Sequence, residues 1–305
     1  MNRRQFLASS AFGVAATSLG RLPVWAQQPA APPVTAFNEL RRGVGYFTGQ
    51  GGTIGYLLGG DGAIAVDSQF PATAGPCVEG LKQKAPKGIA LLINTHHHGD
   101  HTSGNPVFKP VVQHIVCQEK CLEWHRKTAA AATNPNAAPP AFADVTFGES
   151  WSTTLGDEKV WAFYNGVGHT SGDAIVVFEK ANVVHLGDLM FNRLHPRLDF
   201  GAGGSARNWI KVLDKVARKH RDAMFIFGHA KAGMAVTGSV KELQYFKDYL
   251  SRVVDIVQKA IKAKQSKEEL VKTTEIPGFP DHGSSGQVLT APGILGAVYD
   301  EITAK

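Results

Sequence analysis

The stretch IALLINTHHHGDH, residues 89–101, carries the strongest structural signal in the chain. Its first five residues form an uninterrupted apolar run of strand length, which is typical of a strand buried on both faces. In α/β proteins, ligands and chemistry lie at the carboxyl ends of the strands. Imidazole and carboxylate groups gathered at such an end suit zinc, manganese or iron(II). The groups that follow this strand are His96, His97, His98, Asp100 and His101.

The spacing within this run separates the side chains into two sets. His96 and His98 lie two residues apart, so an extended loop turns both rings to one side. By the same alternation, His97 points the other way, toward a neighbouring group or solvent, and is not expected to bind metal. Asp100 and His101 follow on the next turn, and their side chains are able to reach a second position close to the first. One loop is therefore able to supply ligands to two metals.

A histidine run is alternatively an adventitious metal-binding tract on a solvated loop. Further strand ends weigh against that interpretation, because each presents a metal-competent side chain beside a glycine. His169 follows Gly168 between two predicted strands, Asp188 follows Gly187, and His229 follows Gly228.

With these residues the chain resembles the metallo-β-lactamase fold superfamily. Thr95–His101 is similar to its T-H-x-H-x-D-H signature, and the three later residues match the order and rough spacing of its further metal motifs. The resemblance covers about residues 40–262. It implies an α/β fold of four layers, an αβ/βα sandwich, with the site between the two sheet edges.

The resemblance also implies a pair of metal ions, two Zn²⁺ per chain, although other divalent metals are possible. The implied ligands of the first metal are His96, His98 and His169. Those of the second are Asp100, His101 and His229, and Asp188 bridges the two ions. Asp67, after the predicted strand 63–66, matches an early aspartate that supports the metal-binding loop without binding metal itself.

The predicted reaction is metal-assisted hydrolysis of a small-molecule substrate. Two divalent ions that share a water bring its pKa from about 15.7 toward neutrality, so that a bound hydroxide attacks a carbonyl or related centre at pH 7. Asp188 would fix the metal spacing and Asp100 would orient the nucleophile, which makes both predicted catalytic residues. The bond cut is that of an ester, a lactone, a lactam or a related group.

Other activities of the same fold remain open. A bridging aspartate at Asp188 is similar to thioester hydrolases of the glyoxalase II type, to lactonases and to phosphodiesterases. True β-lactamases of this fold have Cys or Ser there, but export is typical of them, so action on antibiotics is an alternative. A di-iron oxidoreductase is another. Such relatives usually carry an acidic residue at one histidine position of the first motif, where this chain has His98.

The N-terminal residues 1–26 are predicted to be a signal peptide. Arg3 and Arg4 precede a modestly apolar run, and Val24–Ala26 offers small or aliphatic residues for cleavage. The arginine pair resembles the twin-arginine motif, whose pathway exports folded proteins. Residues 27–35 are then a disordered lead-in, and 36–305 a single hydrolase domain with a helical C-terminal extension. The predicted location is periplasmic or secreted, with the export machinery as a partner.

Composition excludes several classes of protein. With 43% hydrophobic and 19% charged residues, the chain is not intrinsically disordered. No run of 18 apolar residues occurs, so stable membrane insertion is not expected. Of the formal charge of +6, three arginines fall within residues 1–26, which leaves +3 for the rest. Such a mild and scattered charge does not indicate nucleic-acid binding. A disulfide between Cys117 and Cys121 is not expected.

The rest of the chain alternates strands and helices. Strands are predicted at 44–47, 53–58, 63–66, 89–93, 115–117, 159–164, 174–178, 183–186 and 224–227. Helices are predicted at 73–84, 119–131, 205–219 and 240–262, and a short closing helix at 294–302. The loop 192–197 leaves the site, so His195 is a candidate for substrate contact. His185 is predicted to be a core imidazole. Surface or capping positions are predicted for His114, His125, His220 and His282. Residues 277–286 are expected to fold over the site or pack at an interface.

Overall fold

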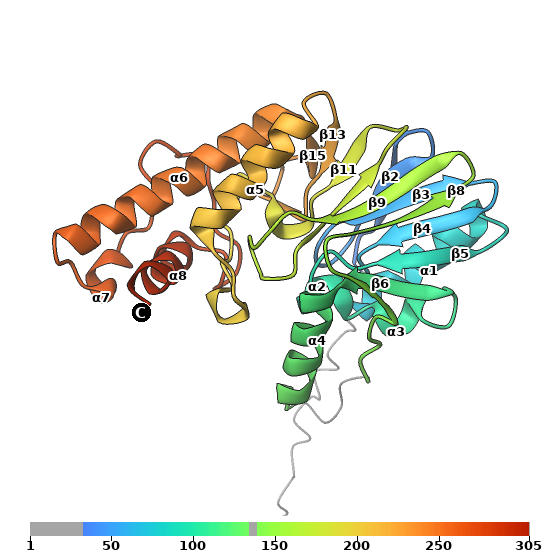
Figure 1. Cartoon of the computed structure of the whole chain (residues 1–305), viewed down its shortest axis with the longest axis horizontal. Helices are drawn as coiled ribbons and strands as arrows, with labels where there is room; N and C mark the ends of the chain where they lie inside the picture. Colours follow the sequence, from blue (N-terminus) through green and yellow to red (C-terminus); the bar gives the residue numbers. More distant parts are fainter. Residues whose placement is uncertain (1–32, 134–138, 305) are drawn as a thin grey trace, which may run out of the picture. The chain divides into compact units, whose positions relative to one another are not determined.

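The computed structural model describes residues 33–133 and 139–304 of the chain (Figure 1). The predicted signal peptide at 1–26 lies outside the described residues, as does most of the predicted lead-in at 27–35. Within the described ranges, no helix is long and apolar enough to cross a membrane.

The first sheet has the order β1-β2-β3-β4-β5-β6-β7. It begins antiparallel and becomes parallel from β4 onward. Parallel pairing requires crossovers, and these place helices over the sheet. The strands are β1 (Ala36–Arg41), β2 (Val44–Thr48), β3 (Ile54–Gly59), β4 (Gly62–Val66), β5 (Ile89–Ile93), β6 (His114–Gln118) and β7 (Val145–Phe147).

The second sheet has the order β15-β13-β11-β10-β9-β8, with one parallel pair between β11 and β13. A separate two-stranded ladder joins β12 to β14. The strands are β8 (Ser150–Leu155), β9 (Glu158–Tyr164), β10 (Ala174–Phe178), β11 (Val183–His185), β12 (Phe191–Asn192), β13 (Met224–Ile226), β14 (His229–Ala230) and β15 (Thr237–Gly238).

Side-chain alternation along the strands divides the core into layers. In β4, Ile64 and Val66 pack between the two sheets, whereas Ala63 and Ala65 pack toward α1. In β11, Val183 joins the layer between the sheets and Val184 packs toward α5 and α6. Burial on both faces explains why these strands are continuously apolar in sequence.

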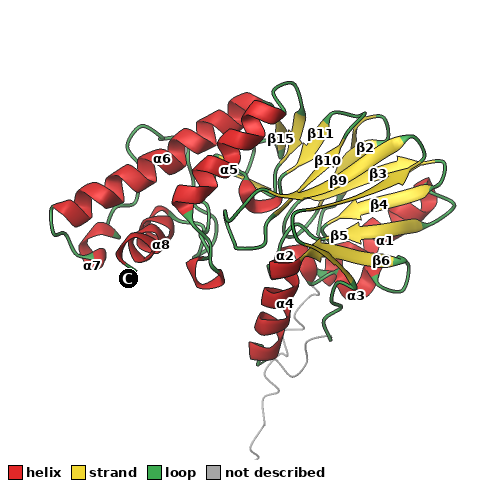
Figure 2. Cartoon of the chain, viewed as in Figure 1, coloured by secondary structure: helices red, strands yellow, loops and turns green. Residues whose placement is uncertain are grey.

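Helices cover the two outer faces (Figure 2). On the second sheet, Trp209 of α5 and Phe246 of α6 are fully buried against each other. The helices are α1 (Pro71–Lys84), α2 (Gly99–Thr102), α3 (Asn105–Phe108), α4 (Glu119–Ala131), α5 (Ala206–Lys219), α6 (Val240–Lys262), α7 (Lys267–Leu270) and α8 (Ala291–Thr303). The predicted α/β fold and its αβ/βα layering are confirmed.

Some predicted elements differ from the structure. The predicted strand 183–186 ends at His185, because Leu186 leads into a 3₁₀ turn, η1 (Gly187–Leu189), that begins at a positive φ. The strands β1 and β8 were not predicted from the sequence. The predicted closing helix is present as α8, with Ile294, Leu295 and Val298 fully buried. The three cysteine thiols are free and buried.

Candidate metal centre

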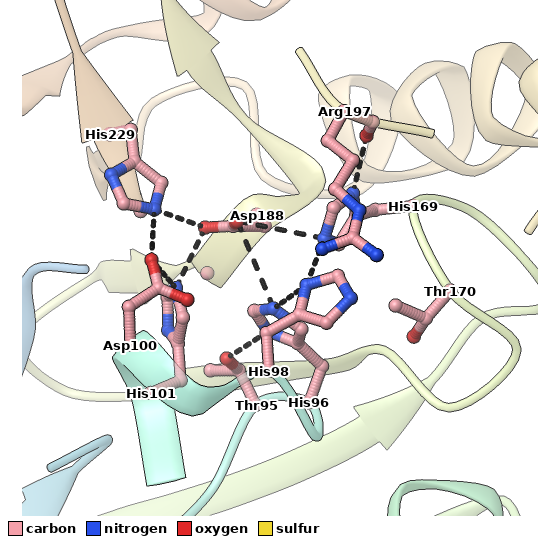
Figure 3. A network of polar contacts seen from close by, with 12 residues as sticks. Thr95, His96, His98, Asp100, His101, His169, Thr170, Asp188, Arg197 and His229 are labelled. Atoms are coloured by element: carbon pink, nitrogen blue, oxygen red, sulfur yellow. Dashed lines mark hydrogen bonds and ion pairs between the residues drawn. The ribbon is translucent and has the colours of Figure 1, made fainter. Parts of the chain in front are cut away.

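The predicted metal-binding side chains come from separate segments of the chain and point toward one another (Figure 3). The loop after β5 supplies the first four histidine and aspartate side chains, and α2 begins within it. The loop between β9 and β10 supplies His169, the turn after β11 supplies Asp188, and β14 begins at His229. Because these segments belong to both sheets, the site forms only where the sheets meet.

The first group holds three imidazole nitrogens that face one another. His98 Nδ1 lies 3.1 Å from His96 Nε2 and 2.9 Å from His169 Nε2. Asp188 Oδ2 completes the group, at 3.8 Å from His96 Nε2 and 3.6 Å from His169 Nε2. The ligand atoms of these four residues are close enough together to hold one metal ion.

The second group lies on the other oxygen of the same aspartate. Asp188 Oδ1 is 3.0 Å from His101 Nε2 and 3.3 Å from His229 Nε2. Asp100 Oδ2 lies 3.0 Å from His229 Nε2 and 3.7 Å from His101 Nε2. These four residues are again able to hold one ion. Asp188 therefore belongs to both groups, one oxygen to each.

Two potential metal-ligating atoms of the second group lie close together without forming a hydrogen bond, and this arrangement suits a bound cation. Asp188 Oδ1 and His101 Nε2 are both buried, and neither makes a hydrogen bond of acceptable geometry although they are 3.0 Å apart. Buried polar atoms without a partner are costly. A cation between them would satisfy both, so the residues present fit a metal.

Two of the predicted ligands after β5, His96 and His101, are held by the ring nitrogen that points away from the metal-binding groups, which leaves the other nitrogen free to bind a metal. His101 Nδ1 donates to Asp67 Oδ2 at 2.8 Å. His96 Nδ1 lies 3.1 Å from Thr95 Oγ1, which itself donates to Asp67 Oδ2 at 2.8 Å. Asp67 also accepts from the Thr95 backbone N–H and has a positive φ of 67°. This buried aspartate therefore orients two histidines, the kind of supporting role that the sequence predicted for it.

Two further positioning residues were not found from the sequence. Asp199 Oδ2 accepts from His98 Nε2 at 2.7 Å, and the Arg197 carbonyl accepts from His169 Nδ1 at 2.6 Å. The Arg197 guanidinium donates to the same Asp199 oxygen at 3.2 Å. Arg197 ends the loop 192–197 that was predicted to leave the site, but no motif marks either its carbonyl or Asp199 as a support of the histidines.

Burial and the close approach of acidic and imidazole groups shift the pKa values of the site residues. Burial lowers the pKa of His101, but Asp188, Asp100 and Asp67 outweigh burial and raise it well above its ordinary value. Burial raises the pKa of Asp188, but His229 and His101 outweigh it and hold that pKa well below the ordinary value. Burial lowers the pKa of His169 to about 3, which favours the neutral, metal-binding form.

His97 was predicted to point either toward a neighbouring group or toward solvent. In the structure it is buried. Its ring lies 6.1 Å from that of Trp124, and its Nε2 is 3.8 Å from Asp199 Oδ2. Together with His98 and Asp199 it forms a third cluster of potential ligand atoms. The Asp199 carboxylate in that cluster already accepts a hydrogen bond from His98. We therefore interpret the third cluster as residues that position His98 of the first group, and not as a third metal site.

The remaining histidines separate into confirmed and corrected predictions. His185 is a core imidazole, as predicted, and its Nε2 donates to the Thr53 carbonyl at 3.0 Å. His220 is the C-cap residue of α5. His125 and His282 are buried, contrary to the predicted surface or capping positions, because aromatic rings cover them.

The candidate substrate contact at His195 is not supported. His195 is buried, and its Nδ1 bonds the Tyr249 hydroxyl at 2.8 Å. The C-terminal segment covers this loop: the Gly283 N–H donates to the Arg193 carbonyl, and the His195 N–H donates to the Gly283 carbonyl. Part of the segment 277–286 therefore packs on the loop 192–197.

A family model described as the metallo-beta-lactamase superfamily matches residues 48–229, which include every residue of both groups. The chain belongs to the metallo-β-lactamase superfamily. Members of this metal-dependent superfamily share the fold described above.

Individual relatives of this superfamily member carry hydrolase names. A hydroxyacylglutathione hydrolase from Methylococcus capsulatus is 30% identical over 186 residues, which cover 60% of this chain and 65% of that protein. A metallo-beta-lactamase type 2 from Bacillus sp. is 23% identical over 197 residues, covering 62% of this chain and 72% of the relative. The chain thus spans slightly less than two thirds of the first relative.

Among solved structures, the stereoselective inverting sec-alkylsulfatase from Pseudomonas sp. superposes with a TM-score of 0.66 at 13% identity. The match covers 88% of this chain and 50% of that one. At this identity the likeness concerns the fold alone.

Proposed function

We propose that this chain is an exported hydrolase that uses two divalent cations, zinc in the first instance, to cleave a carbonyl-centred bond of a small molecule. The observation that carries the proposal is the position of Asp188. Its Oδ2 lies within 4 Å of two histidine nitrogens of one group, and its Oδ1 lies within 4 Å of two histidine nitrogens of the other. A carboxylate that offers one oxygen to each group is suited to hold two metal ions side by side.

In this proposal, seven side chains hold the two ions. His96, His98 and His169 bind the first, and Asp100, His101 and His229 bind the second, with Asp188 common to both. Nitrogen and oxygen ligands without thiolate are compatible with zinc and with other divalent metals. The bound ions would supply Lewis acidity and lower the pKa of an attacking water toward neutrality.

The protein's own contribution is to fix positions and to move a proton. Asp188 sets the separation of the two groups, because each of its oxygens faces a different group and its side chain is only 5% exposed. Asp100 has a side chain that is 28% exposed, so its carboxylate reaches both the site and solvent. From there Asp100 is able to orient the attacking water and to accept its proton.

The relatives support a carbonyl ester or thioester as the scissile bond. One is named a hydroxyacylglutathione hydrolase, and another a metallo-beta-lactamase. An amide of a strained ring, a β-lactam, is therefore the second candidate bond, and a lactone is chemically intermediate. Export, and with it a periplasmic or secreted location, is proposed from the arginine pair and the cleavage region within residues 1–26.

The test is hydrolysis by the full chain after zinc loading, with bound metal counted by elemental analysis. Substrates are a p-nitrophenyl ester, an acyl thioester, a γ-lactone and a chromogenic cephalosporin. Asp188→Ala is compared with Asp157→Ala, which removes an exposed carboxylate outside the two groups.

We expect about two zinc ions per chain, and turnover of at least one substrate that a chelator abolishes. Asp188→Ala should lose that turnover and bind less zinc, whereas Asp157→Ala should match the parent. Protein that holds no metal, or turnover unaffected by Asp188→Ala, would refute the proposal. Turnover of the cephalosporin alone would replace the ester with the lactam as the substrate.

A further inference from the structure

The C-terminal helix α8 places a buried carboxylate at the start of α5 (Figure 1). The Glu301 side chain is only 4% exposed. Its Oε2 accepts from the Ala206 N–H at 2.8 Å, and its Oε1 accepts from the Ser205 hydroxyl at 2.6 Å. Arg207 Nε adds a third donor at 3.2 Å. Because a buried carboxylate is stable only where such donors surround it, Glu301 fixes α8 to these residues.

The three donors belong to the first turn of α5, where backbone N–H groups lack partners within the helix. Ser205 is the N-cap residue, and its Oγ accepts from the Asn208 N–H at 3.2 Å. The Ala206 N–H is satisfied by Glu301 instead. A negative charge at this end of a helix is also stabilised by the helix dipole. Glu301 therefore holds the start of α5 in place from a separate helix.

The start of α5 in turn holds the loop that carries His169. The Ser205 N–H donates to the Gly168 carbonyl at 2.9 Å. Asn208 Nδ2 donates to the Val167 carbonyl at 2.6 Å. Both carbonyls belong to the residues that directly precede His169 in the chain. A short series of hydrogen bonds thus connects the carboxylate of α8 with a predicted ligand of the first metal.

The segment 199–204, which leads into α5, also packs against His169. The Asp199 N–H donates to the His169 carbonyl at 3.0 Å, and the Gly204 N–H donates to the Asp199 carbonyl at 2.8 Å. A Cβ at Gly204 would lie only 2.5 Å from the His169 carbonyl oxygen. A contact this close means that the segment cannot move toward His169 without displacing it.

We propose that Glu301 is a positioning residue of the metal centre: it anchors the start of α5, and α5 in turn holds His169 where the first metal ion binds. This inference rests on the proposed function, because it assigns Glu301 a role toward that metal. Glu301 acts through Ser205 and Gly168 and is not itself a ligand.

The anchor should act on the first ion more than on the second. His169 belongs to the first group only. In the second group, the His101 ring is held by Asp67, which follows β4 in the first sheet. Loss of the Glu301 carboxylate should therefore displace His169 and leave His101 in place.

Four variants of the full chain separate positioning from general stability. Glu301→Ala removes the carboxylate. Glu301→Gln keeps one oxygen for the Ala206 N–H and is the conservative rescue. Val298→Ala shortens a fully buried side chain of the same helix and leaves Glu301 in place. Asp300→Ala removes a neighbouring carboxylate that is 44% exposed and contacts Lys267.

The first readout is amide hydrogen exchange of the metal-free proteins, well below their Tm. We compare the segments 167–171 and 199–206 with the buried strand β5. Glu301→Ala should speed exchange in these two segments at least tenfold relative to β5, the value of a hydrogen bond to a charged group. Glu301→Gln should do so less, and Val298→Ala and Asp300→Ala should leave the ratio unchanged.

The second readout is metal affinity, measured by chelator competition with Zn²⁺. Loss of a support of a metal ligand costs about 10–100-fold in affinity. We expect Glu301→Ala to weaken the first ion about tenfold and the second less than threefold, with partial recovery in Glu301→Gln. In the cadmium-loaded protein, ¹¹³Cd NMR distinguishes the two ions, since the first group offers three nitrogens and the second two. Only the signal of the first should shift.

Unchanged exchange in Glu301→Ala would overturn the inference. So would an equal loss of zinc affinity in Glu301→Ala and Val298→Ala at an equal loss of Tm, because Glu301 would then act through stability alone. Altered exchange in Glu301→Ala, with no zinc bound by the parent, would support the anchor and count against the proposed function. Tight zinc binding by the parent with unaltered exchange in the variant would do the reverse.

Discussion

The hydrogen bond between His98 and Asp199 yields the sharpest prediction for the metal centre. Asp199 Oδ2 accepts from His98 Nε2 at 2.7 Å, and its Oδ1 accepts from the Ala202 N–H at 3.1 Å. In Asp199→Asn, the amide oxygen is able to keep the bond to Ala202, so the new NH₂ group faces His98 Nε2. Two donors then oppose each other, which favours the tautomer of His98 that carries its proton on Nδ1.

That tautomer removes the lone pair of His98 that faces His96 and His169. A charge-assisted hydrogen bond contributes about 1.5–3 kcal/mol, and loss of such a partner of a metal ligand costs about 10–100-fold in affinity. We therefore expect Asp199→Asn to weaken binding of the first zinc ion by at least tenfold. The measurement is competition with a chromophoric chelator at pH 7.5, with metal stoichiometry as a second readout.

The matched control is Arg197→Gln, which removes the guanidinium that also contacts Asp199 but keeps the backbone carbonyl that holds His169. It should weaken zinc binding by less than about threefold. Thermal unfolding of both variants without metal shows whether the loop itself is intact. If Asp199→Asn binds zinc as tightly as the parent, or if its metal-free form is already unfolded, the argument from the tautomer fails.

Three further predictions concern stability and geometry. Zinc at about 100 times its Kd should stabilise the fold by about 2.7 kcal/mol. Calorimetry should show this as a rise in Tm of about 5 °C or more that a chelator reverses. An unchanged Tm would contradict the proposed metal centre. Gly228→Ala should weaken zinc binding and destabilise the fold by about 1–3 kcal/mol, since a Cβ there would overlap Asp188 Oδ1; parental zinc affinity would show that Asp188 is not constrained by this contact. Burial lowers the pKa of His282 from an ordinary 6.5 to about 3, so between these values the unfolded chain binds a proton that the folded chain excludes. The contribution of the neutral His282 ring to the free energy of unfolding is therefore complete above pH 6.5. It decreases as the pH falls, and the loss is about 2 kcal/mol at pH 5. His282→Phe should reduce the difference in unfolding free energy between pH 7.5 and pH 5 by this amount. The control His114→Gln, at an exposed site, should not. An unchanged pH dependence in His282→Phe would show that His282 is not the group responsible.

The layers of the fold could be predicted because the motif at residues 95–101 and the later His and Asp residues resemble a family of known fold, with which the apolar run 89–93 agrees as a buried strand. Sequence reasoning failed for β1 and β8, whose sequences AFNELR and SWSTTL contain charged or hydroxyl residues and alternate partly exposed positions. Such strands depend on their neighbours more than on their own composition.

The residues of the two groups could be predicted from their spacing after strands, and the structure brings them together. Asp199 could not, because it contacts a histidine 101 residues away from within an irregular loop. Burial of His125 and His282 was also missed. An isolated histidine carries no periodic signal, and its cover comes from Phe142 in one case and from Tyr249 in the other.

The division of the metal centre between the two sheets has a consequence for how the protein acquires its metal. Neither half of the chain contains all four residues of either candidate group, since Asp188 lies in the second half and His96 and His101 in the first. If the two groups bind metal as proposed, tight binding requires that the two sheets have already packed. If the chain crosses the membrane already folded, as the arginine pair at its N-terminus predicts, its metal is selected by the supply in the compartment where it folds, before it meets the metals outside.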